Sequence, residues 1–147
     1  MPWTPHITVA AVAERDGRFL VVEEEADGAV VFNQPAGHLE PGETLIDAVV
    51  REVLEETAWE FEPEGLLGVY LYPTPTVDYL RFCFAGRATV HHPDRALDRG
   101  ILRAPWLTRE EIAATGRMRS PLVLQCIDDY LAGHRYPADL VRHVYPR

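Results

Sequence analysis

Residues 37–59 of the chain read GHLEPGETLIDAVVREVLEETAW. Thr44 and Asp47 have the spacing of a helix-capping box, and Pro41-Gly42 cannot continue a helix backwards. Apolar residues then recur every three or four positions, which is typical of a helix with one buried face. The stretch therefore predicts a helix over residues 44–57 with a core-facing stripe formed by Leu45, Ala48, Val49, Val53 and the methyl group of Thr57.

Three glutamates stand on one face of this helix, because Glu52, Glu55 and Glu56 occupy positions i, i+3 and i+4. Like charges at that spacing destabilise a helix by roughly 0.2–0.5 kcal/mol per pair, so folding alone does not favour them. Taken alone, such a run is more typical of a solvated acidic helix face. The alternative is a site for Mg²⁺, which prefers carboxylate oxygens and bridges to substrate phosphates. Arg51 and Glu43 lie close enough in sequence to orient these ligands.

The spacing of the charged residues decides between the two interpretations. Five residues separate Gly37 from Glu43, seven more precede Arg51-Glu52, and Val53, Glu55-Glu56 and Ala58-Trp59 complete the pattern. This resembles the Nudix box, Gly-x5-Glu-x7-Arg-Glu-U-x-Glu-Glu-x-Gly-U, where U is a bulky apolar residue. At residue frequencies near 7%, six fixed matches occur by chance about once in 10⁷ start positions. The pattern thus favours a metal-dependent phosphohydrolase.

Ala58 departs from this pattern, which has glycine at the same position. A residue just past a helix end commonly adopts a left-handed conformation. Alanine in that conformation is destabilised by about 1 kcal/mol relative to glycine. We therefore expect a local cost in stability and no loss of activity, since the ligand residues are intact.

The resemblance extends beyond the box. Blocks similar to a bacterial phosphatase branch of the Nudix family lie at residues 5–10, 19–24, 32–40, 80–82, 119–123 and 133–137, whereas residues 62–75 and 91–103 match loosely. The resemblance implies an α/β (α+β) Nudix fold, an α/β/α sandwich around a mixed sheet, with one domain over residues 1–147. It also implies dependence on Mg²⁺, with Mn²⁺ as a substitute, and release of terminal phosphate. Nucleoside tri- and diphosphates are the implied substrates, and a pyrimidine diphosphate of thiamine biosynthesis is a further one.

The resemblance also assigns roles to individual residues. Glu52 and Glu56 match the main metal ligands, Glu55 a further ligand, and the carbonyl of Ala36 a backbone ligand, while Arg51 and Glu43 complete the catalytic set. The base that activates water is either Glu52 or a carboxylate from a later loop, where Asp94 and Asp98 are available.

Substrate contacts are expected from polar and aromatic residues near strand ends: His6, Phe32, Gln34, His38 and Arg81, with Trp3 and Tyr79 as further choices. Core packing is an equally good interpretation of Phe32 and Tyr79. For Arg81, a surface ion pair competes with phosphate binding.

The rest of the chain predicts strands at residues 7–13, 18–24, 30–32, 66–72, 79–90 and 101–107, with a loop at 33–37. Thr108 begins a short helix, and Ser120-Pro121 begins a final helix that Gly133 ends. Interleaved strands and helices indicate an α/β or α+β domain.

Composition limits the functional classes. The 147 residues carry a net charge of −9, which disfavours binding to long nucleic acids. No apolar run approaches the roughly 18 residues of a membrane span, and the N-terminus lacks the features of a secretory signal. Cys83 and Cys126 do not form a disulfide framework, so a cytoplasmic location is expected. All 14 basic residues are arginine, which excludes lysine-dependent chemistry.

Two other functions remain open from the sequence. One is a Nudix enzyme acting on dinucleoside polyphosphates or RNA 5′ ends, although the acidity of the chain argues against RNA. The other is a non-catalytic nucleotide-sensing module, which the four retained glutamates disfavour. The sequence leaves open whether the protein is a monomer or a dimer.

Overall fold

The computed structural model describes residues 2–146 and shows two sheets and three α-helices among them. The elements, in chain order, are β1 (His6–Arg15), β2 (Arg18–Leu20), β3 (Val22–Ala26), β4 (Ala29–Asn33), β5 (Ala36–His38), α1 (Leu45–Thr57), β6 (Trp59–Pro73), β7 (Asp78–His91), β8 (Ile101–Arg103), β9 (Trp106–Leu107), α2 (Arg109–Ala114), α3 (Leu122–Leu131) and a 3₁₀ helix, Ala138–Leu140.

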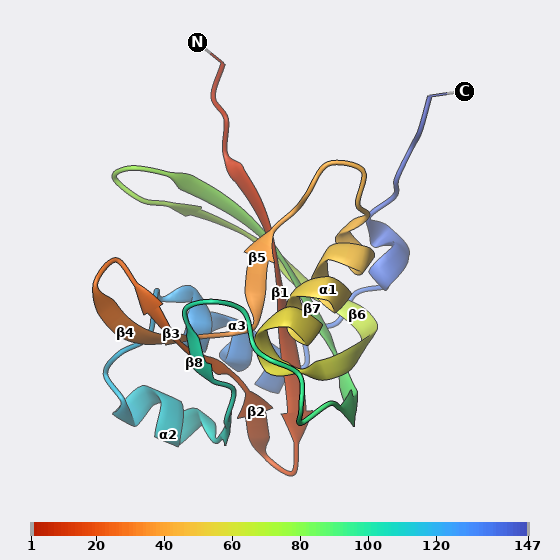
Figure 1. Cartoon of the computed structure of the whole chain (residues 1–147). Helices are drawn as coiled ribbons and strands as arrows, with labels where there is room; N and C mark the ends of the chain where they lie inside the picture. Colours follow the sequence, from red (N-terminus) through yellow and green to blue (C-terminus); the bar gives the residue numbers. More distant parts are fainter. Residues whose placement is uncertain (1, 147) are drawn as a thin grey trace.

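The larger sheet is mixed. Its strand order is β6-β7-β1-β2-β9, and β5 also pairs with β1. The β1–β7 pair is parallel, whereas β1 pairs antiparallel with β5 and β2. The smaller sheet has the order β4-β3-β8. Helices α1 and α3 lie on opposite sides of the larger sheet (Figure 1), so the predicted α/β/α arrangement around a mixed sheet is confirmed.

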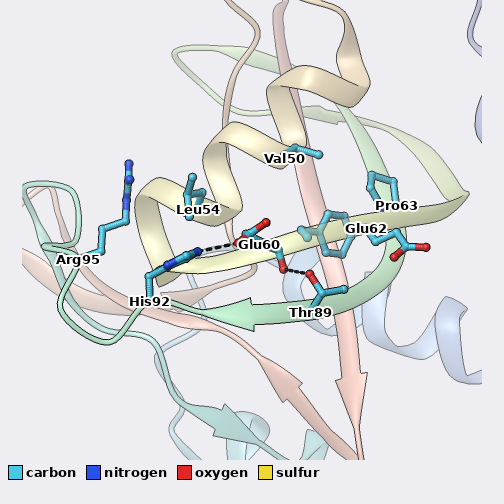
Figure 2. A pocket seen from close by; sticks show the side chains of 9 residues that line it. Val50, Leu54, Glu60, Glu62, Pro63, Thr89, His92 and Arg95 are labelled. Atoms are coloured by element: carbon cyan, nitrogen blue, oxygen red, sulfur yellow. Dashed lines mark hydrogen bonds and ion pairs between the residues drawn. The ribbon is translucent and has the colours of Figure 1, made fainter.

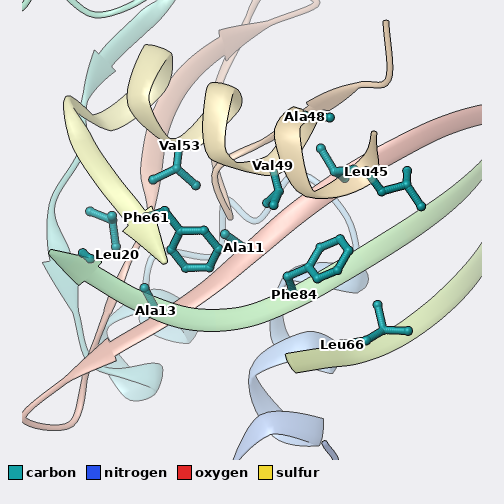
Figure 3. Close-up of a cluster of buried hydrophobic side chains, with 12 residues drawn as sticks. Ala11, Ala13, Leu20, Leu45, Ala48, Val49, Val53, Phe61, Leu66 and Phe84 are labelled. Carbon is teal, nitrogen blue, oxygen red and sulfur yellow. The ribbon is translucent and has the colours of Figure 1, made fainter. Parts of the chain in front are cut away.

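Both faces of β1 are buried, which explains why its sequence is a continuous apolar run. Val9, Ala11 and Ala13 pack in a cluster beneath α1, whereas Ala10 and Val12 pack in a second cluster beneath α3. Figure 3 shows the first cluster, where side chains of α1 meet the sheet. The predicted helical stripe is confirmed, since its members are all buried: Leu45, Ala48, Val49, Val53 and Thr57.

The ends of α1 follow from local hydrogen bonds. The Thr44 side chain accepts a hydrogen bond from the Asp47 backbone N–H at 3.0 Å, which caps the first turn. Ala58 ends the helix in the left-handed conformation, with φ 62° and ψ 18°, and its N–H donates to the Leu54 carbonyl. Thus alanine adopts here the conformation that the family pattern assigns to glycine.

Two predicted strands are each divided between the sheets. The segment at 18–24 breaks at Val21, so that β2 joins the larger sheet and β3 the smaller one. The segment at 101–107 breaks at the position facing Val21, between β8 and β9. There the Val21 N–H donates to the Pro105 carbonyl. Pro105 has no N–H of its own and cannot continue a ladder. Apolar periodicity does not report the change of sheet at Val21, because buried residues continue on both sides of the break.

Two further differences concern strand limits. The predicted strand at 66–72 is part of β6, which begins at Trp59 and pairs with β7 through three register shifts. The predicted loop at 33–37 contains the start of β5, which is too short for its three residues to show a periodic pattern. Among the described residues, no helix is long and apolar enough to cross a membrane.

Candidate metal and substrate site

A cleft of about 640 Å³ opens between α1, the larger sheet and the segment before α3. Its lining includes Glu52 and Glu56 of α1, Ala36, Gly37 and His38 of β5, and residues of β1, β3, β4, β6 and β7. Helix α1 presents these two glutamates inward because they follow the buried stripe on the same side, and their exposed fractions are only 8% and 9%. The fold therefore removes both carboxylates from most of their contact with water.

Glu56 is the more deeply buried carboxylate. One of its oxygens accepts a hydrogen bond from the Ala36 backbone N–H at 2.9 Å, and no arginine pairs with it among the described residues. Burial raises the pKa of Glu56 to about 9, and the charges of Glu52, Glu24 and Asp98 act in the same direction. At neutral pH this carboxyl group therefore holds a proton unless a cation neutralises it.

Glu52 lies directly over the backbone of Gly37. A Cβ atom at Gly37 would stand 2.2 Å from the carboxylate carbon of Glu52, so any larger residue would displace that side chain. Arg51 donates a hydrogen bond from Nη1 to the same carboxylate at 2.8 Å. Burial raises the pKa of Glu52, and the bond from Arg51 opposes that shift. The absence of a side chain at Gly37 thus leaves the space that the Glu52 carboxylate occupies.

Arg51 ties the preceding loop to the glutamates. Its Nε and Nη2 atoms donate to the two oxygens of Glu43 at 2.6 and 2.9 Å, in a bidentate pair. Nη2 also donates to the His38 carbonyl at 3.2 Å, and Nη1 to Glu55 at 3.4 Å. The hydrogen bond from Arg51 lowers the pKa of Glu43. Arg51 and Glu43 are therefore positioned to orient the carboxylates of α1.

Glu55 does not line the cleft but lies at its edge, beside the loop that follows β7. The Asp98 backbone N–H donates to the Glu55 carbonyl at 2.9 Å. Burial and then the charge of Asp98 raise the pKa of Glu55, and Asp98 raises those of Glu52 and Glu56 as well. Both late-loop carboxylates named from the sequence are exposed, but only Asp98 lies next to the cluster, since its N–H bonds to the Glu55 carbonyl.

The carbonyl of Ala36 faces the same side of β5 as these carboxylates. Backbone groups of Pro35 and Leu39 point toward β1: the Pro35 carbonyl accepts from the Ala11 N–H, and the Leu39 N–H donates to the Ile7 carbonyl. Since backbone groups alternate along a strand, Ala36 points away from β1. Its N–H already donates to Glu56 on that side.

The donor set is therefore entirely oxygen, from two buried carboxylates, a third at the edge and one carbonyl, and this chemistry suits a hard divalent cation. Within residues 2–146, no three acidic, histidine or cysteine side chains are already gathered at ligand distances. The ion pairs from Arg51 hold Glu52 and Glu55, and the Ala36 N–H holds Glu56. A cation held by these residues would require their side chains to leave these partners.

The residues expected to contact substrate separate into two groups. His38 and Tyr79 line the cleft, and His6 joins them through a 3.0 Å hydrogen bond between its Nδ1 and His38 Nε2. Phe32 and Gln34 are each 1% exposed and do not line the cleft. Gln34 instead donates from Nε2 to the Val123 carbonyl at 2.7 Å. The positions of these two side chains therefore favour core packing over direct substrate contact: Phe32 is in β4 and Gln34 directly follows it, and both are turned inward.

Arg81 lines the cleft and is only 6% exposed. It donates to the side-chain oxygens of Gln34 at 2.9 Å and Asn33 at 3.1 Å. The alternative of a surface ion pair is therefore wrong. Strand β7 is covered by α3 at this position, and alternation along the strand alone could not show that.

The sequence did not identify several lining residues. These are Asn33, the ion pair between Glu24 and Arg119 at 2.6 Å, and the hairpin residues Tyr72, Thr74 and Thr76. Glu24 and Arg119 stand 95 positions apart. Each lies in a block that resembles the Nudix family, but nothing in either block indicates the other partner.

A second cavity, of about 660 Å³, lies on the other side of α1 (Figure 2). Val50, Leu54 and Pro63 border it, and its polar edge includes the Glu60–His92 hydrogen bond at 2.7 Å. None of the box glutamates lines this cavity. The candidate site is therefore the cleft that contains Glu52 and Glu56.

Both the sequence and the fold of this chain match known proteins. Residues 4–125 match the family model described as "NUDIX domain". The chain is 41% identical to Phosphatase NudJ of Escherichia coli K12 over 138 residues, which span 93% of this chain and 90% of that protein. A NUDIX hydrolase from Nitrosomonas europaea is 51% identical, with a TM-score of 0.93 over 96% of this chain and 98% of its own. The NUDIX domain of Shewanella oneidensis NrtR, complexed with ADP ribose, shares the fold at 17% identity, with a TM-score of 0.67 and 88% of each chain covered.

Proposed function

Because this chain belongs to the Nudix family of hydrolases, we propose that it is a Mg²⁺-dependent phosphohydrolase that releases orthophosphate from nucleoside tri- and diphosphates. The observation that carries the proposal is the burial of Glu56 beside Ala36 and Glu52 without a basic partner. A buried carboxylate with no counter-charge is unfavourable, and a bound divalent cation removes that penalty.

Glu52, Glu56 and the Ala36 carbonyl would hold the cation, with Glu55 as a further ligand at the edge of the cleft. When bound, Mg²⁺ neutralises phosphate charge and lowers the pKa of a coordinated water. Mn²⁺ accepts the same oxygen ligands and would substitute for it. Glu43 and Arg51 keep Glu52 in place through the 2.6 and 2.8 Å bonds of the guanidinium.

The reaction forms a bond between a water oxygen and the terminal phosphorus, and breaks the phosphoanhydride bond to the leaving oxygen. One proton of the water passes to a carboxylate of this chain. Glu52 is one acceptor for that proton, because it faces the cleft directly. The other is Glu55 at the edge of the cleft, because burial and then the charge of Asp98 raise its pKa.

The choice of orthophosphate as product rests on the similarity to Phosphatase NudJ along nearly the whole length of both chains. A pyrimidine diphosphate is a second substrate to include, since the cleft is lined by Tyr72 and Tyr79, whose rings can stack on a heterocycle. Dinucleoside polyphosphates and RNA 5′ ends are the alternatives. The net charge of −9 opposes the approach of long RNA.

The test is a panel of nucleoside di- and triphosphates, a pyrimidine diphosphate and a dinucleoside polyphosphate, with separate detection of orthophosphate and pyrophosphate. We expect Mg²⁺-dependent orthophosphate release, abolished by EDTA and reduced at least about 100-fold in Glu56→Gln, since replacing residues that merely orient metal ligands already costs roughly 10–100-fold. Glu64→Gln, an exposed glutamate of β6, is the matched control and should behave as wild type.

The outcome that overturns the proposal is absence of turnover across the panel, or equal turnover in Glu56→Gln. Nucleotide binding that persists in EDTA without any turnover would instead identify a nucleotide-sensing module. Pyrophosphate as the sole product would assign the protein to the pyrophosphohydrolases of the family.

A further inference from the structure

Two arginines line the cleft, and they differ in their partners. Arg119 forms an ion pair with Glu24 at 2.6 Å, so its charge is matched within the protein. Arg81 forms no ion pair with any Asp or Glu of residues 2–146. Only 6% of Arg81 is exposed, so its positive charge lies in a low-dielectric position without an anion beside it.

The surroundings of Arg81 fix the guanidinium without neutralising it. Nη1 donates to Gln34 Oε1 and Nη2 to Asn33 Oδ1, both uncharged amide oxygens. The Gln34 amide is oriented in turn by its bond to the Val123 carbonyl. Behind the guanidinium lies the Cys126 sulfur, 3.8 Å from Nη1. A guanidinium has five N–H donors, so these three contacts leave donors free to face the cleft.

The position of Arg81 relative to the glutamates follows from strand register. Arg81 of β7 lies opposite Thr8 of β1, and Thr8 lies opposite His38 of β5. Two strand spacings, roughly 10 Å, therefore separate the backbones of Arg81 and β5. Asn33, which Arg81 contacts, is three residues before Ala36. The free guanidinium donors thus lie along the same cleft as the proposed cation ligands, within reach of the same polyphosphate group.

We propose that Arg81 binds the terminal phosphoryl group of the substrate, the group that leaves as orthophosphate, and thereby directs hydrolysis to that phosphate. This inference rests on the proposed function. The terminal phosphoryl group is small and highly charged, which suits a buried and unneutralised guanidinium. The nucleoside is larger and uncharged, and suits the exposed rim formed by His38 and Thr76.

The test measures binding of inorganic phosphate by calorimetry at constant ionic strength, both in EDTA and with Mg²⁺. We expect wild type to bind phosphate and Arg81→Gln to bind it at least about tenfold more weakly, as for loss of a hydrogen bond to a charged group. Arg87→Gln is the matched control, since Arg87 is an exposed arginine on the same strand, and it should retain wild-type affinity.

Arg81→Lys guards against a folding defect in the glutamine variant, because it keeps the charge and loses the planar fork. We expect its phosphate affinity to lie between those of wild type and Arg81→Gln. Equal phosphate affinity in a folded Arg81 variant and wild type would overturn the inference. So would a wild type that binds no phosphate under either condition, or an Arg81 variant that loses affinity for an unphosphorylated nucleoside only.

The two proposals fail separately. Turnover with phosphate binding that does not depend on Arg81 removes the role of Arg81 and leaves the hydrolase assignment intact. Arg81-dependent phosphate binding without turnover on any substrate removes the hydrolase assignment alone.

Discussion

The carboxylate of Glu56 accepts a hydrogen bond from the backbone N–H of Ala36 at 2.9 Å. This contact joins the last turn of α1 to β5, and both residues line the same cleft. A peptide N–H satisfies one lone pair of the buried carboxyl group but supplies no counter-charge. The protonation of Glu56 and the binding of a cation are therefore linked, and this linkage has measurable consequences.

The first prediction concerns the stability of the metal-free protein. The folded pKa of Glu56 is about 9, above its ordinary value of 4.5, so the folded state binds more protons than the unfolded state between these values. The contribution of Glu56 to the free energy of unfolding should therefore be largest below pH 4.5. It should fall as the pH rises toward 9, by at most about 1.4 kcal/mol per pH unit. Urea unfolding in EDTA at several pH values measures this.

Glu56→Gln is the control for this pH dependence, because it keeps an acceptor for the Ala36 N–H and cannot titrate. Its free energy of unfolding should vary less between pH 6 and pH 9 than that of wild type. A slope unchanged by the substitution would show that Glu56 is ionised in the metal-free fold.

A second prediction concerns the bidentate pair between Arg51 and Glu43. Replacing Arg51 by Lys keeps the charge but cannot reproduce the two bonds of 2.6 and 2.9 Å. We expect a roughly 10–100-fold loss of metal affinity or activity, the range found for residues that orient metal ligands. Glu43→Gln should have a similar effect. The loss of metal affinity or activity in the double variant should be much smaller than the product of the two single losses. A double loss equal to that product would contradict coupling through one ion pair.

A third prediction tests the space over Gly37. In Gly37→Ala the new Cβ would overlap the carboxylate of Glu52, which must then move. We expect metal affinity to fall while the thermal transition stays cooperative, since the displaced group is a carboxylate that lines the cleft and does not belong to either apolar core cluster. Metal affinity equal to that of wild type would mean that the position of Glu52 is not important for the site.

A fourth prediction concerns Ala58, whose φ of 62° is strained for any residue with a Cβ atom. Ala58→Gly should stabilise the protein by about 0.5–1 kcal/mol, because the relief of strain exceeds the cost of glycine in the unfolded chain. For a domain of this size the melting temperature should rise by about 1–4 °C. Turnover should be unchanged, and a lower melting temperature would contradict the strain argument.

Residues close together in sequence determine the features that could be predicted. Helix α1 was predicted because Thr44 caps it and its apolar stripe has helical spacing. The carboxylate cluster was predicted because Glu52 and Glu56 are neighbours on that helix. These features depend on helical geometry, which sequence spacing reports directly.

Features built from distant segments could not be predicted in this way. The environment of Arg81 comes from Gln34 and Cys126, 47 and 45 positions away, so only the folded chain shows that this charge is buried. The change of sheet at Val21 likewise depends on Pro105, which belongs to another segment. The alternation of polar and apolar residues gives the face of a strand but not what covers that face.

The most direct test of the account is a calorimetric titration of Mn²⁺ into the metal-free protein, with Glu56→Gln and Glu64→Gln titrated in parallel. The account predicts that wild type and Glu64→Gln bind the cation with the same affinity, whereas Glu56→Gln binds it at least about tenfold more weakly. Mn²⁺ affinity that is identical in Glu56→Gln and wild type would contradict the assignment of the cleft as the metal site.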